Sequence, residues 1–249
     1  MPFGQCPGNG RRPICDRTAD YRGRVTRRIL VADDDPMVRE AYRMFFSRHD
    51  TLEVVGEARD GNEAVSLHRE LKPDITLMDL QMPDKSGVEA IGEICQADPT
   101  ACIVALTTFG TRDYIVAALR AGAAGYLLKD AGGPALLAAV EQALDGEMPL
   151  SSAVRRELVR DVVDSAVRER PALPDPGLAP RERELLTWLA QGLTNQQIGQ
   201  KMFVSEGSVK QYLSHIGDKL GLKSRTQILM RAVQLGIVDP TELDPITGL

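Results

Sequence analysis

The sequence predicts two domains of different class: a doubly wound α/β domain with a parallel five-stranded sheet, and a smaller all-α domain of four helices. Two observations lead to this expectation. The chain has 249 residues, more than most single domains contain. Its apolar pattern also changes along the chain, from alternating strand and helix signals to helix signals alone.

The first domain is expected over residues 27–148, where short β-branched or Leu-rich runs alternate with helical stretches. Such alternation predicts a parallel sheet with helices on both faces. The expected strands are Arg28–Ala32, Leu52–Ala58, Ile75–Met78, Ile103–Thr107 and Gly125–Leu128. The expected helices are Pro36–Arg48, Gly61–Leu71, Ser86–Asp98, Asp113–Ala121 and Gly133–Asp145.

Residues 149–177 are expected to link the domains through a polar helix, Ala153–Arg168, and a stiff proline-rich segment. The second domain is expected over residues 178–238, because Ser or Thr caps and terminating glycines delimit short helices there. These helices are Pro180–Gln191, Asn195–Met202, Glu206–Leu220 and Arg225–Leu235. Residues 239–249 form an expected C-terminal tail.

The first 26 residues carry five arginines and two cysteines but no apolar periodicity, so we expect a disordered leader. It lacks the apolar core of a secretory signal, and no run in the chain approaches the ~20 apolar residues that span a membrane. A valine codon can start translation in bacteria, so Val25 is a candidate start and residues 1–24 are expected to be dispensable. The four cysteines form no CxxC pair, which favours a reduced, cytoplasmic setting.

Charge divides unevenly between the two domains. Residues 27–148 carry 12 Lys and Arg against 21 Asp and Glu, whereas residues 178–238 carry 8 against 4. An acidic half joined to a basic half is typical of a regulatory domain attached to one that faces nucleic acid.

Charged side chains follow three of the expected strands. Asp33, Asp34 and Asp35 follow the first, Asp79 follows the third, and Lys129 follows the fifth. Because the carboxyl ends of parallel strands meet at one edge of a sheet, these side chains should lie together. Clustered carboxylates repel one another unless a cation neutralises them, and Mg²⁺ with a phosphate co-ligand suits such an oxygen-rich site.

The segments that carry these residues resemble the receiver domain of two-component response regulators, over about residues 27–146. They are Ile29–Pro36, Pro73–Pro83, Val104–Thr108 and Ala121–Asp130. The resemblance implies that Asp79 accepts a phosphoryl group from a histidine kinase. It also implies that Mg²⁺ is bound by Asp79, Asp34 and the backbone carbonyl of Gln81, with Asp33 acting through water. Asp35 is not expected to touch the metal.

The resemblance assigns three further roles near Asp79. Lys129 would contact the phosphoryl oxygens, and Thr107 would move its hydroxyl onto the phosphorylated Asp79. Tyr126 would be a switch that moves inward with Thr107. Thr108, the next residue along the chain, is the other candidate for this hydroxyl. The spacing to Lys129 in the sequence favours Thr107 over Thr108.

The second domain resembles the four-helix helix-turn-helix domain of the NarL/LuxR (FixJ) type of regulator. The matching segments are Leu178–Leu186, Gly192–Ile198, Val204–Leu213 and Leu220–Gln227. Glu206–Leu220 would be the recognition helix, because polar side chains occupy one face and apolar ones the other. Lys210 and Gln211 are the expected base-edge contacts, with Ser214 and Ser208 on the same face.

Four cations are expected to meet DNA phosphates, which position a protein without specifying sequence. They are Lys201, Lys219, Lys223 and Arg225. Trp188 is expected in the core and His215 on the helix surface. Gly199 and Gly217 lie inside helices where the family usually has larger residues, and each should weaken its helix by ~1 kcal/mol relative to Ala, which puts tight packing of the recognition helix in question.

The whole pattern indicates a transcription factor controlled by phosphorylation, with a histidine kinase, double-stranded DNA and RNA polymerase as partners and no membrane association. Phosphorylation should favour a homodimer that binds two half-sites. One alternative is a phosphorylation-independent interaction protein whose receiver binds a partner. Another is a phosphatase-like enzyme, which would need a second carboxylate two residues after Asp79, where Gln81 stands.

Overall fold

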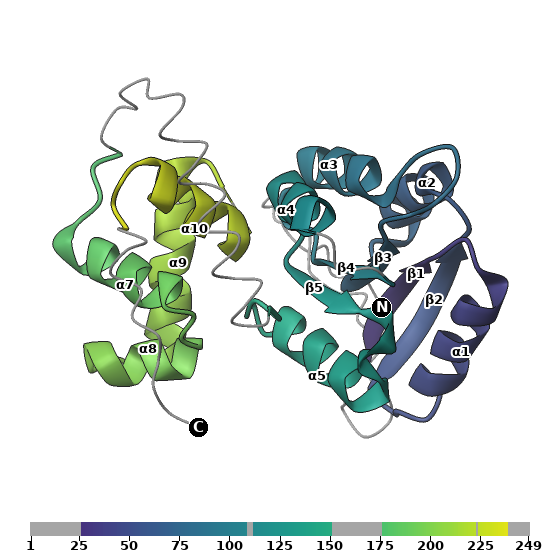
Figure 1. The fold of residues 1–249 in the computed structure, drawn as a ribbon. Helices are drawn as coiled ribbons and strands as arrows, with labels where there is room; N and C mark the ends of the chain where they lie inside the picture. The colour runs from purple at the N-terminus through teal and green to yellow at the C-terminus, as the bar shows by residue number, and fades with distance from the viewer. Residues whose placement is uncertain (1–25, 109–111, 151–175, 223, 239–249) are drawn as a thin grey trace, which may run out of the picture.

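The computed structural model describes residues 26–108, 112–150, 176–222 and 224–238, and confirms the expected fold class (Figure 1). The leader, the expected linker helix Ala153–Arg168 and the C-terminal tail lie outside these described residues. Among the described residues, no helix is long and apolar enough to cross a lipid bilayer.

The first domain is a five-stranded parallel sheet with strand order β2-β1-β3-β4-β5. Its strands are β1 (Arg27–Ala32), β2 (Leu52–Ala58), β3 (Ile75–Asp79), β4 (Ile103–Thr107) and β5 (Gly125–Leu128). Its helices are α1 (Pro36–Phe46), α2 (Gly61–Leu71), α3 (Gly87–Ala97), α4 (Arg112–Ala121) and α5 (Gly133–Leu144), with a short 3₁₀ turn over Lys129–Ala131. The observed bounds differ from those expected by at most two residues.

Helices cover both faces of the sheet, as Figure 1 shows: α1 and α5 on one face, and α2, α3 and α4 on the other. The central strands β3 and β4 are buried along their whole length, which is typical of strands covered on both faces. In this strand order the chain passes from β1 to β2 on one side and then crosses to β3 on the other side of β1. Because the connections leave β1 and β3 in opposite directions, a crevice forms beyond the carboxyl ends of these two strands. The acidic residues expected to form the site lie at these two strand ends.

The second domain contains α7 (Pro180–Ala190), α8 (Asn195–Met202), α9 (Glu206–Leu220) and α10 (Arg225–Gln234). The Ser205 hydroxyl accepts a hydrogen bond from the Ser208 backbone N–H and so caps α9. The inward face of α9 is buried through Val209, Leu213 and Ile216, as the sequence pattern predicts.

The two glycines inside α8 and α9 have a packing role that the sequence did not reveal. A Cβ atom on Gly199 would lie 2.7 Å from the Val204 carbonyl oxygen, and one on Gly217 would lie 2.5 Å from the Leu222 carbonyl oxygen. The glycines therefore let neighbouring turns approach the helices closely. The question that the glycines raise about the packing of α9 is thereby answered, because Gly217 is itself buried against the turn that follows the helix.

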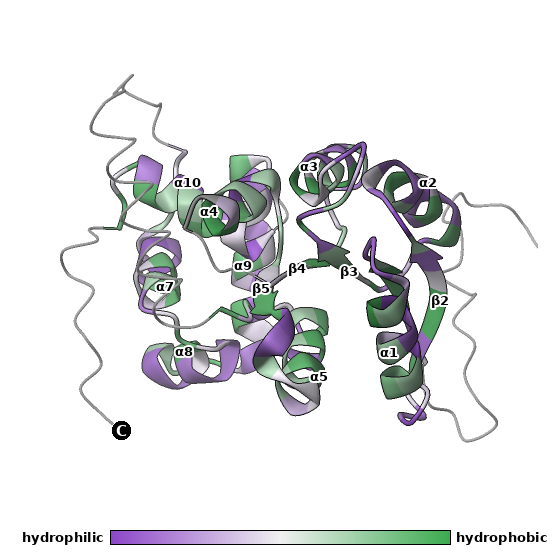
Figure 2. Cartoon of the chain, turned by 45° about the vertical axis from the view of Figure 1, so that its right-hand side comes forward, coloured by the Kyte–Doolittle hydropathy of each residue, from purple (hydrophilic) through white to green (hydrophobic). Residues whose placement is uncertain are grey.

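The two domains contact each other through α4 and α10, which lie side by side (Figure 2). At this contact the Thr226 hydroxyl donates to the Ala124 carbonyl at 3.4 Å, and a Cβ on Gly122 would lie 3.0 Å from the Gln227 side chain. The buried apolar cluster under α2, α3 and α4 continues into the helical domain.

Candidate phosphorylation site and DNA-binding surface

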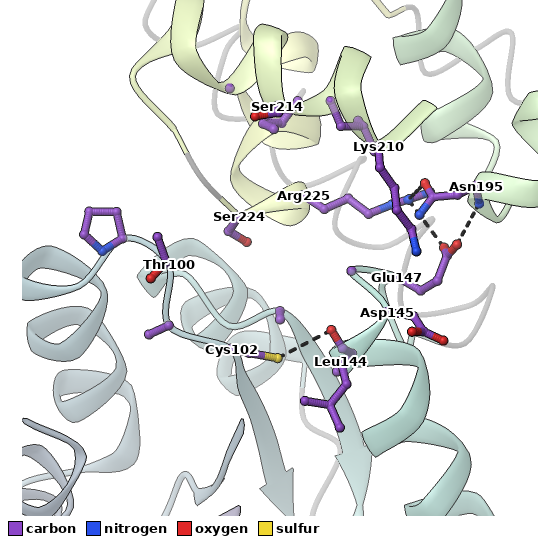
Figure 3. Close-up of a pocket in the computed structure, with 18 of the residues that line it drawn as sticks. Thr100, Cys102, Leu144, Asp145, Glu147, Asn195, Lys210, Ser214, Ser224 and Arg225 are labelled. Atoms are coloured by element: carbon purple, nitrogen blue, oxygen red, sulfur yellow. Dashed lines mark hydrogen bonds and ion pairs between the residues drawn. The ribbon is translucent and has the colours of Figure 1, made fainter. Parts of the chain in front are cut away.

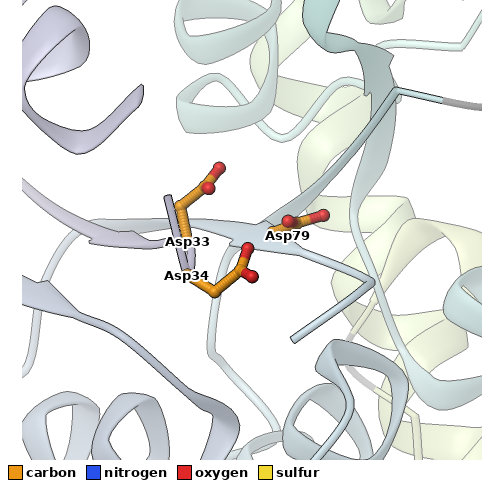
Figure 4. Close-up of side chains that lie close together, drawn as sticks. All are labelled: Asp33, Asp34 and Asp79. Carbon is orange, nitrogen blue, oxygen red and sulfur yellow. The ribbon is translucent and has the colours of Figure 1, made fainter. Parts of the chain in front are cut away.

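Three carboxylates meet at the carboxyl ends of β1 and β3 (Figure 4). Asp33, Asp34 and Asp79 each place an oxygen within 4.8 Å of the others. Asp33 and Asp79 are buried, at 0% and 4% exposed, whereas Asp34 is exposed. Two buried carboxylates beside an exposed one form an oxygen-rich site that suits a hard divalent cation.

Lys129 joins this cluster from the end of β5. Its Nζ lies 2.6 Å from Asp33 Oδ2 and 2.8 Å from Asp79 Oδ2. Burial raises the pKa of Asp33, and the hydrogen bond and charge of Lys129 offset part of that rise. Burial alone would lower the pKa of Lys129, but the two carboxylates raise it overall, which keeps the ammonium group charged.

Hydrogen bonds between side chains and backbone groups hold the acidic turn in place. Arg39 on α1 donates from Nη1 to the Asp33 carbonyl at 2.6 Å, and the Gln81 N–H donates to Asp79 Oδ1 at 3.2 Å. Asp35 accepts from the Met37 N–H at 2.8 Å and thereby caps α1. The role of Asp35 is thus structural, and neither this cap nor the brace by Arg39 was foreseen from the sequence.

Gly87 lets the chain pass close behind Asp79. Its N–H donates to the Leu80 carbonyl at 3.1 Å, and a Cβ on Gly87 would lie 1.9 Å from the backbone carbonyl oxygen of Asp79. No side chain could occupy that space without moving the strand end. Gly87 therefore fixes the position of Asp79 although it carries no chemical group of its own.

We expect Gly87→Ala to destabilise the domain by about 1–3 kcal/mol, because the added methyl overpacks a rigid backbone contact. Gly92→Ala in the same helix is the matched control, since a Cβ there would meet nothing closer than 4.0 Å. That change should stabilise the domain by about 0.5–1 kcal/mol through helix propensity. Urea unfolding measures both, and equal effects of the two changes would contradict the close approach at Gly87.

Thr107 and Tyr126 lie on neighbouring strands near this cluster. Thr107 ends β4, one residue beyond Leu106, which pairs with Asp79. Thr107 and Tyr126 are 1% and 6% exposed, whereas Thr108 is exposed. Burial raises the pKa of the Tyr126 phenol, and the Thr107 side chain offsets part of the rise. Burial thus sets Thr107 apart from Thr108, and the switch roles of Thr107 and Tyr126 remain predictions.

The polar face of α9 carries the expected DNA contacts. Lys210, Gln211 and Ser214 are exposed, and Ser208 is half-buried. Lys210 pairs with Glu206 one turn earlier, with 2.9 Å between Nζ and Oε1. This arrangement matches a recognition helix, which must present donors on one face while the other packs inward.

The cations that are expected to contact DNA phosphates have different partners within the chain. Lys201 lies over the Trp188 ring at 5.5 Å from its centroid, and Lys219 pairs with Glu182 at 2.7 Å. Arg225 is turned inward, where its guanidinium donates to Asn195 Oδ1 at 2.5 Å and to the Leu193 carbonyl at 2.7 Å. Lys223 lies outside the described residues.

Helix α9, the expected recognition helix, faces the receiver across a cavity of about 650 Å³ (Figure 3). Glu147, just beyond α5, accepts from the Asn195 N–H at 2.7 Å and pairs with Arg225 at 3.4 Å. Lys210 points across the cavity toward Glu147. The hydrogen bond with Glu206 raises the pKa of Lys210, and the charges of Asp145 and Glu147 raise it further. In this arrangement residues of the receiver and of α9 line the same cavity.

This fold and these two sites define a class of protein, in which a phosphorylation-type receiver is joined to a helix-turn-helix domain. Residues 29–141 match the response regulator receiver domain, and residues 176–232 match the bacterial regulatory proteins of the luxR family. The chain therefore belongs to the NarL/LuxR-type response regulators, which are DNA-binding regulators of two-component systems.

Individual relatives agree with this family. The chain is 38% identical to the transcriptional regulatory protein YxjL of Bacillus subtilis over 211 residues, covering 85% of this chain and 97% of that protein. It is 36% identical to the oxygen regulatory protein NreC of Staphylococcus aureus, with 85% and 99% covered.

Two solved structures are also similar. A LuxR-family two-component response regulator from Aurantimonas is 37% identical and covers 55% of this chain and 99% of its own, with a TM-score of 0.51. The RcsB response regulator of Salmonella typhimurium is 25% identical and covers 82% and 96%, with a TM-score of 0.50.

Proposed function

We propose that this response regulator is switched by phosphorylation of Asp79, and that a histidine kinase is the phosphoryl donor. The observation that carries the proposal is the contact of Asp79 with Lys129 inside a cluster of three carboxylates. An ionised carboxylate beside a fixed cation is a suitable nucleophile toward a phosphoryl group. The helical domain then reads DNA in the cytoplasm, and RNA polymerase is the proposed partner at the promoter.

The residues of the site fit Mg²⁺. The ion would be held by Asp34, Asp79 and the Gln81 carbonyl, with Asp33 acting through water. When bound, it would neutralise the charge that accumulates as a phosphoryl group approaches these carboxylates. Lys129 would keep a positive charge beside the phosphoryl oxygens, and Arg39 would hold the acidic turn in position.

Phosphoryl incorporation from acetyl phosphate tests this proposal. We expect one base-labile phosphoryl group per chain, formed only with Mg²⁺ present. Asp34→Ala should raise the Mg²⁺ concentration needed for half-maximal incorporation, because the ion loses a charged ligand. Incorporation that is independent of Mg²⁺, or unaffected by Asp34→Ala, would contradict the proposed metal site.

We further propose that phosphorylation releases the helical domain, and with it α9, from the receiver. Glu147 supports this step, because its carboxylate pairs with Arg225 and with the N-terminus of α8. This partly buried pair stabilises the closed arrangement, in which the helical domain contacts the receiver, only while both partners remain. DNA phosphates and Glu147 would compete for the same cations.

Glu147→Gln should therefore raise the DNA affinity of the unphosphorylated protein several-fold, because the charge that holds Arg225 is removed. Glu141→Gln is the control, because it removes the same charge from an exposed glutamate of α5. Fluorescence anisotropy with a labelled operator measures the affinity. An unchanged affinity in Glu147→Gln would show that the domain contact does not restrict DNA binding.

A further inference from the structure

The cavity between the receiver and α9 has the size of a small-molecule site. Its volume of about 650 Å³ lies within the roughly 300–1,000 Å³ that ligand pockets occupy, and such pockets are common between domains. Both domains supply apolar side chains to its wall, which include Ala101, Cys102 and Leu144 from the receiver and Leu213, Leu222 and Ile228 from the helical domain. The cavity can therefore receive an organic molecule with an apolar body.

A buried donor of Asn195 lacks a partner at the wall of this cavity. Asn195 is 1% exposed and lines the cavity. Its Oδ1 accepts from Arg225 Nη1, which fixes the orientation of the amide, because a guanidinium can only donate. The Nδ2 group then has no hydrogen-bond partner among the described residues. A buried donor of this kind is costly unless an acceptor reaches it, so this position favours a ligand that carries an acceptor oxygen.

Charged side chains of both signs gather beside Asn195, as Figure 3 shows. The Lys210 ammonium points across the cavity, and the exposed carboxylate of Asp145 lies on the receiver side together with that of Glu147. In addition to the hydrogen bond with Glu206, the charges of these two carboxylates raise the pKa of Lys210, so all of them lie within electrostatic range of the ammonium group.

The charges around the whole cavity balance one another. Three cations and three carboxylates line it, which are Arg27, Lys210, Arg225, Asp74, Asp145 and Glu147. For a plain anion, repulsion by the carboxylates would offset attraction by the cations. A zwitterion can match both signs at once, and it therefore suits this cavity better than an ion of one sign.

We propose that this cavity binds an α-amino acid with a large apolar side chain. The carboxylate of the ligand would accept from Asn195 Nδ2 and pair with Lys210, and its ammonium group would pair with Asp145. Its side chain would pack against Leu213 and Ile228. One molecule thus uses the buried donor, the charges of both signs and the apolar wall, whereas an amine or a carboxylic acid alone would use only part of them.

Such a ligand would hold the two domains together. It contacts Asp145 on the receiver and Lys210 on α9 at once, so it binds the closed arrangement and not an open one. By linkage, it opposes DNA binding, for which Lys210 must leave the receiver. This consequence rests on the proposed function, in which the helical domain is released to read DNA. The cavity would give the regulator a chemical input separate from Asp79.

Isothermal titration calorimetry on the full-length, unphosphorylated chain tests the site, with L-phenylalanine as the probe and L-leucine as a second apolar amino acid. We expect L-phenylalanine to bind at one site. Phenethylamine lacks the carboxylate and 3-phenylpropionate lacks the ammonium group, so each should bind at least about tenfold more weakly. Failure of both amino acids to bind overturns the proposal, as does equal binding of either analogue.

Asp145→Asn locates the ammonium group of the ligand. The change keeps the shape of an exposed side chain and removes its charge, so L-phenylalanine should bind at least about tenfold more weakly, while 3-phenylpropionate should bind no more weakly than to the wild type. Glu141→Gln is the matched control, because it removes an acidic charge from α5 outside the cavity. Equal affinity for L-phenylalanine in wild type and Asp145→Asn, or equal losses in Asp145→Asn and Glu141→Gln, overturns the site.

Asn195→Asp tests the contact with the carboxylate. The variant keeps an acceptor for Arg225 but removes the Nδ2 donor, and an acidic residue is favourable at the start of a helix, so the domain should fold. Binding of L-phenylalanine should again weaken at least about tenfold. An affinity equal to that of the wild type overturns the assignment of Asn195 and, with it, the orientation of the ligand.

Operator binding, measured by fluorescence anisotropy on the same samples, separates this inference from the proposed function. At about ten times its dissociation constant, L-phenylalanine should lower the operator affinity by up to about tenfold, and Asp145→Asn should remove the effect. An operator affinity that bound L-phenylalanine leaves unchanged overturns the regulatory role. A chain that binds no operator at all contradicts the proposed function instead, and the calorimetric titrations then decide on the ligand site by themselves.

Discussion

Asp79→Asn is expected to abolish phosphoryl incorporation and, with it, any rise in DNA affinity on addition of acetyl phosphate. The asparagine side chain has the same shape as that of aspartate and can still reach Lys129. An amide, however, is not a nucleophile toward phosphorus. The fold should persist, because the Gln81 N–H can still donate to the remaining side-chain oxygen. Label and operator binding would be measured on the same sample.

Asp35→Asn is the matched control for this experiment. Asp35 lies one residue from the acidic pair but caps α1, and asparagine caps helices as well as aspartate does. The control should therefore incorporate a full phosphoryl group and respond to it. Label that survives Asp79→Asn would sink the assignment of Asp79, whereas loss of label in Asp35→Asn would extend the reactive cluster to that residue.

The acidic cluster was predictable because strand ends are readable in the sequence. Asp33, Asp79 and Lys129 each follow an apolar run short enough to be a strand, and parallel strands align such ends at one edge. The distances of 2.6 and 2.8 Å from Lys129 to the two carboxylates agree with this expectation. Chain order and strand direction were enough to bring together residues up to 96 positions apart.

The groups that support the cluster were not predictable in the same way. Arg39 acts through its reach to a backbone carbonyl, and Gly87 acts through the absence of a side chain. Neither property leaves a periodic or chemical signal in the sequence. Both depend on how closely two segments approach each other, which only the folded structure defines.

The contact between the domains was also hidden. Arg225 was expected at a DNA phosphate because it is a cation in a basic domain, yet in this arrangement its guanidinium contacts Asn195, Leu193 and Glu147. Glu147 gave no signal beyond its acidic charge. A single sequence does not say which of two possible anions, a DNA phosphate or a carboxylate of the same chain, a surface cation meets.

Lys210→Ala and Gln211→Ala are expected to relax sequence preference on DNA, each by about 1–3 kcal/mol for a lost contact to a base edge, or roughly 5- to 150-fold. Both side chains are exposed on the polar face of α9. Binding to the operator should weaken in these variants, while binding to unrelated DNA should change little. Phosphorylated protein is the sample of choice, because Lys210 faces the receiver in the closed arrangement.

Lys223→Ala provides the contrast, since a phosphate contact positions the protein without reading sequence. It should weaken binding to the operator and to unrelated DNA alike, and reduce the dependence of affinity on salt by about one released counterion. Titrations at several salt concentrations distinguish the two patterns. If the α9 variants and Lys223→Ala lost affinity in the same proportion on both DNAs, α9 would not be the helix that reads the bases, and the division between its polar and apolar faces would need another explanation.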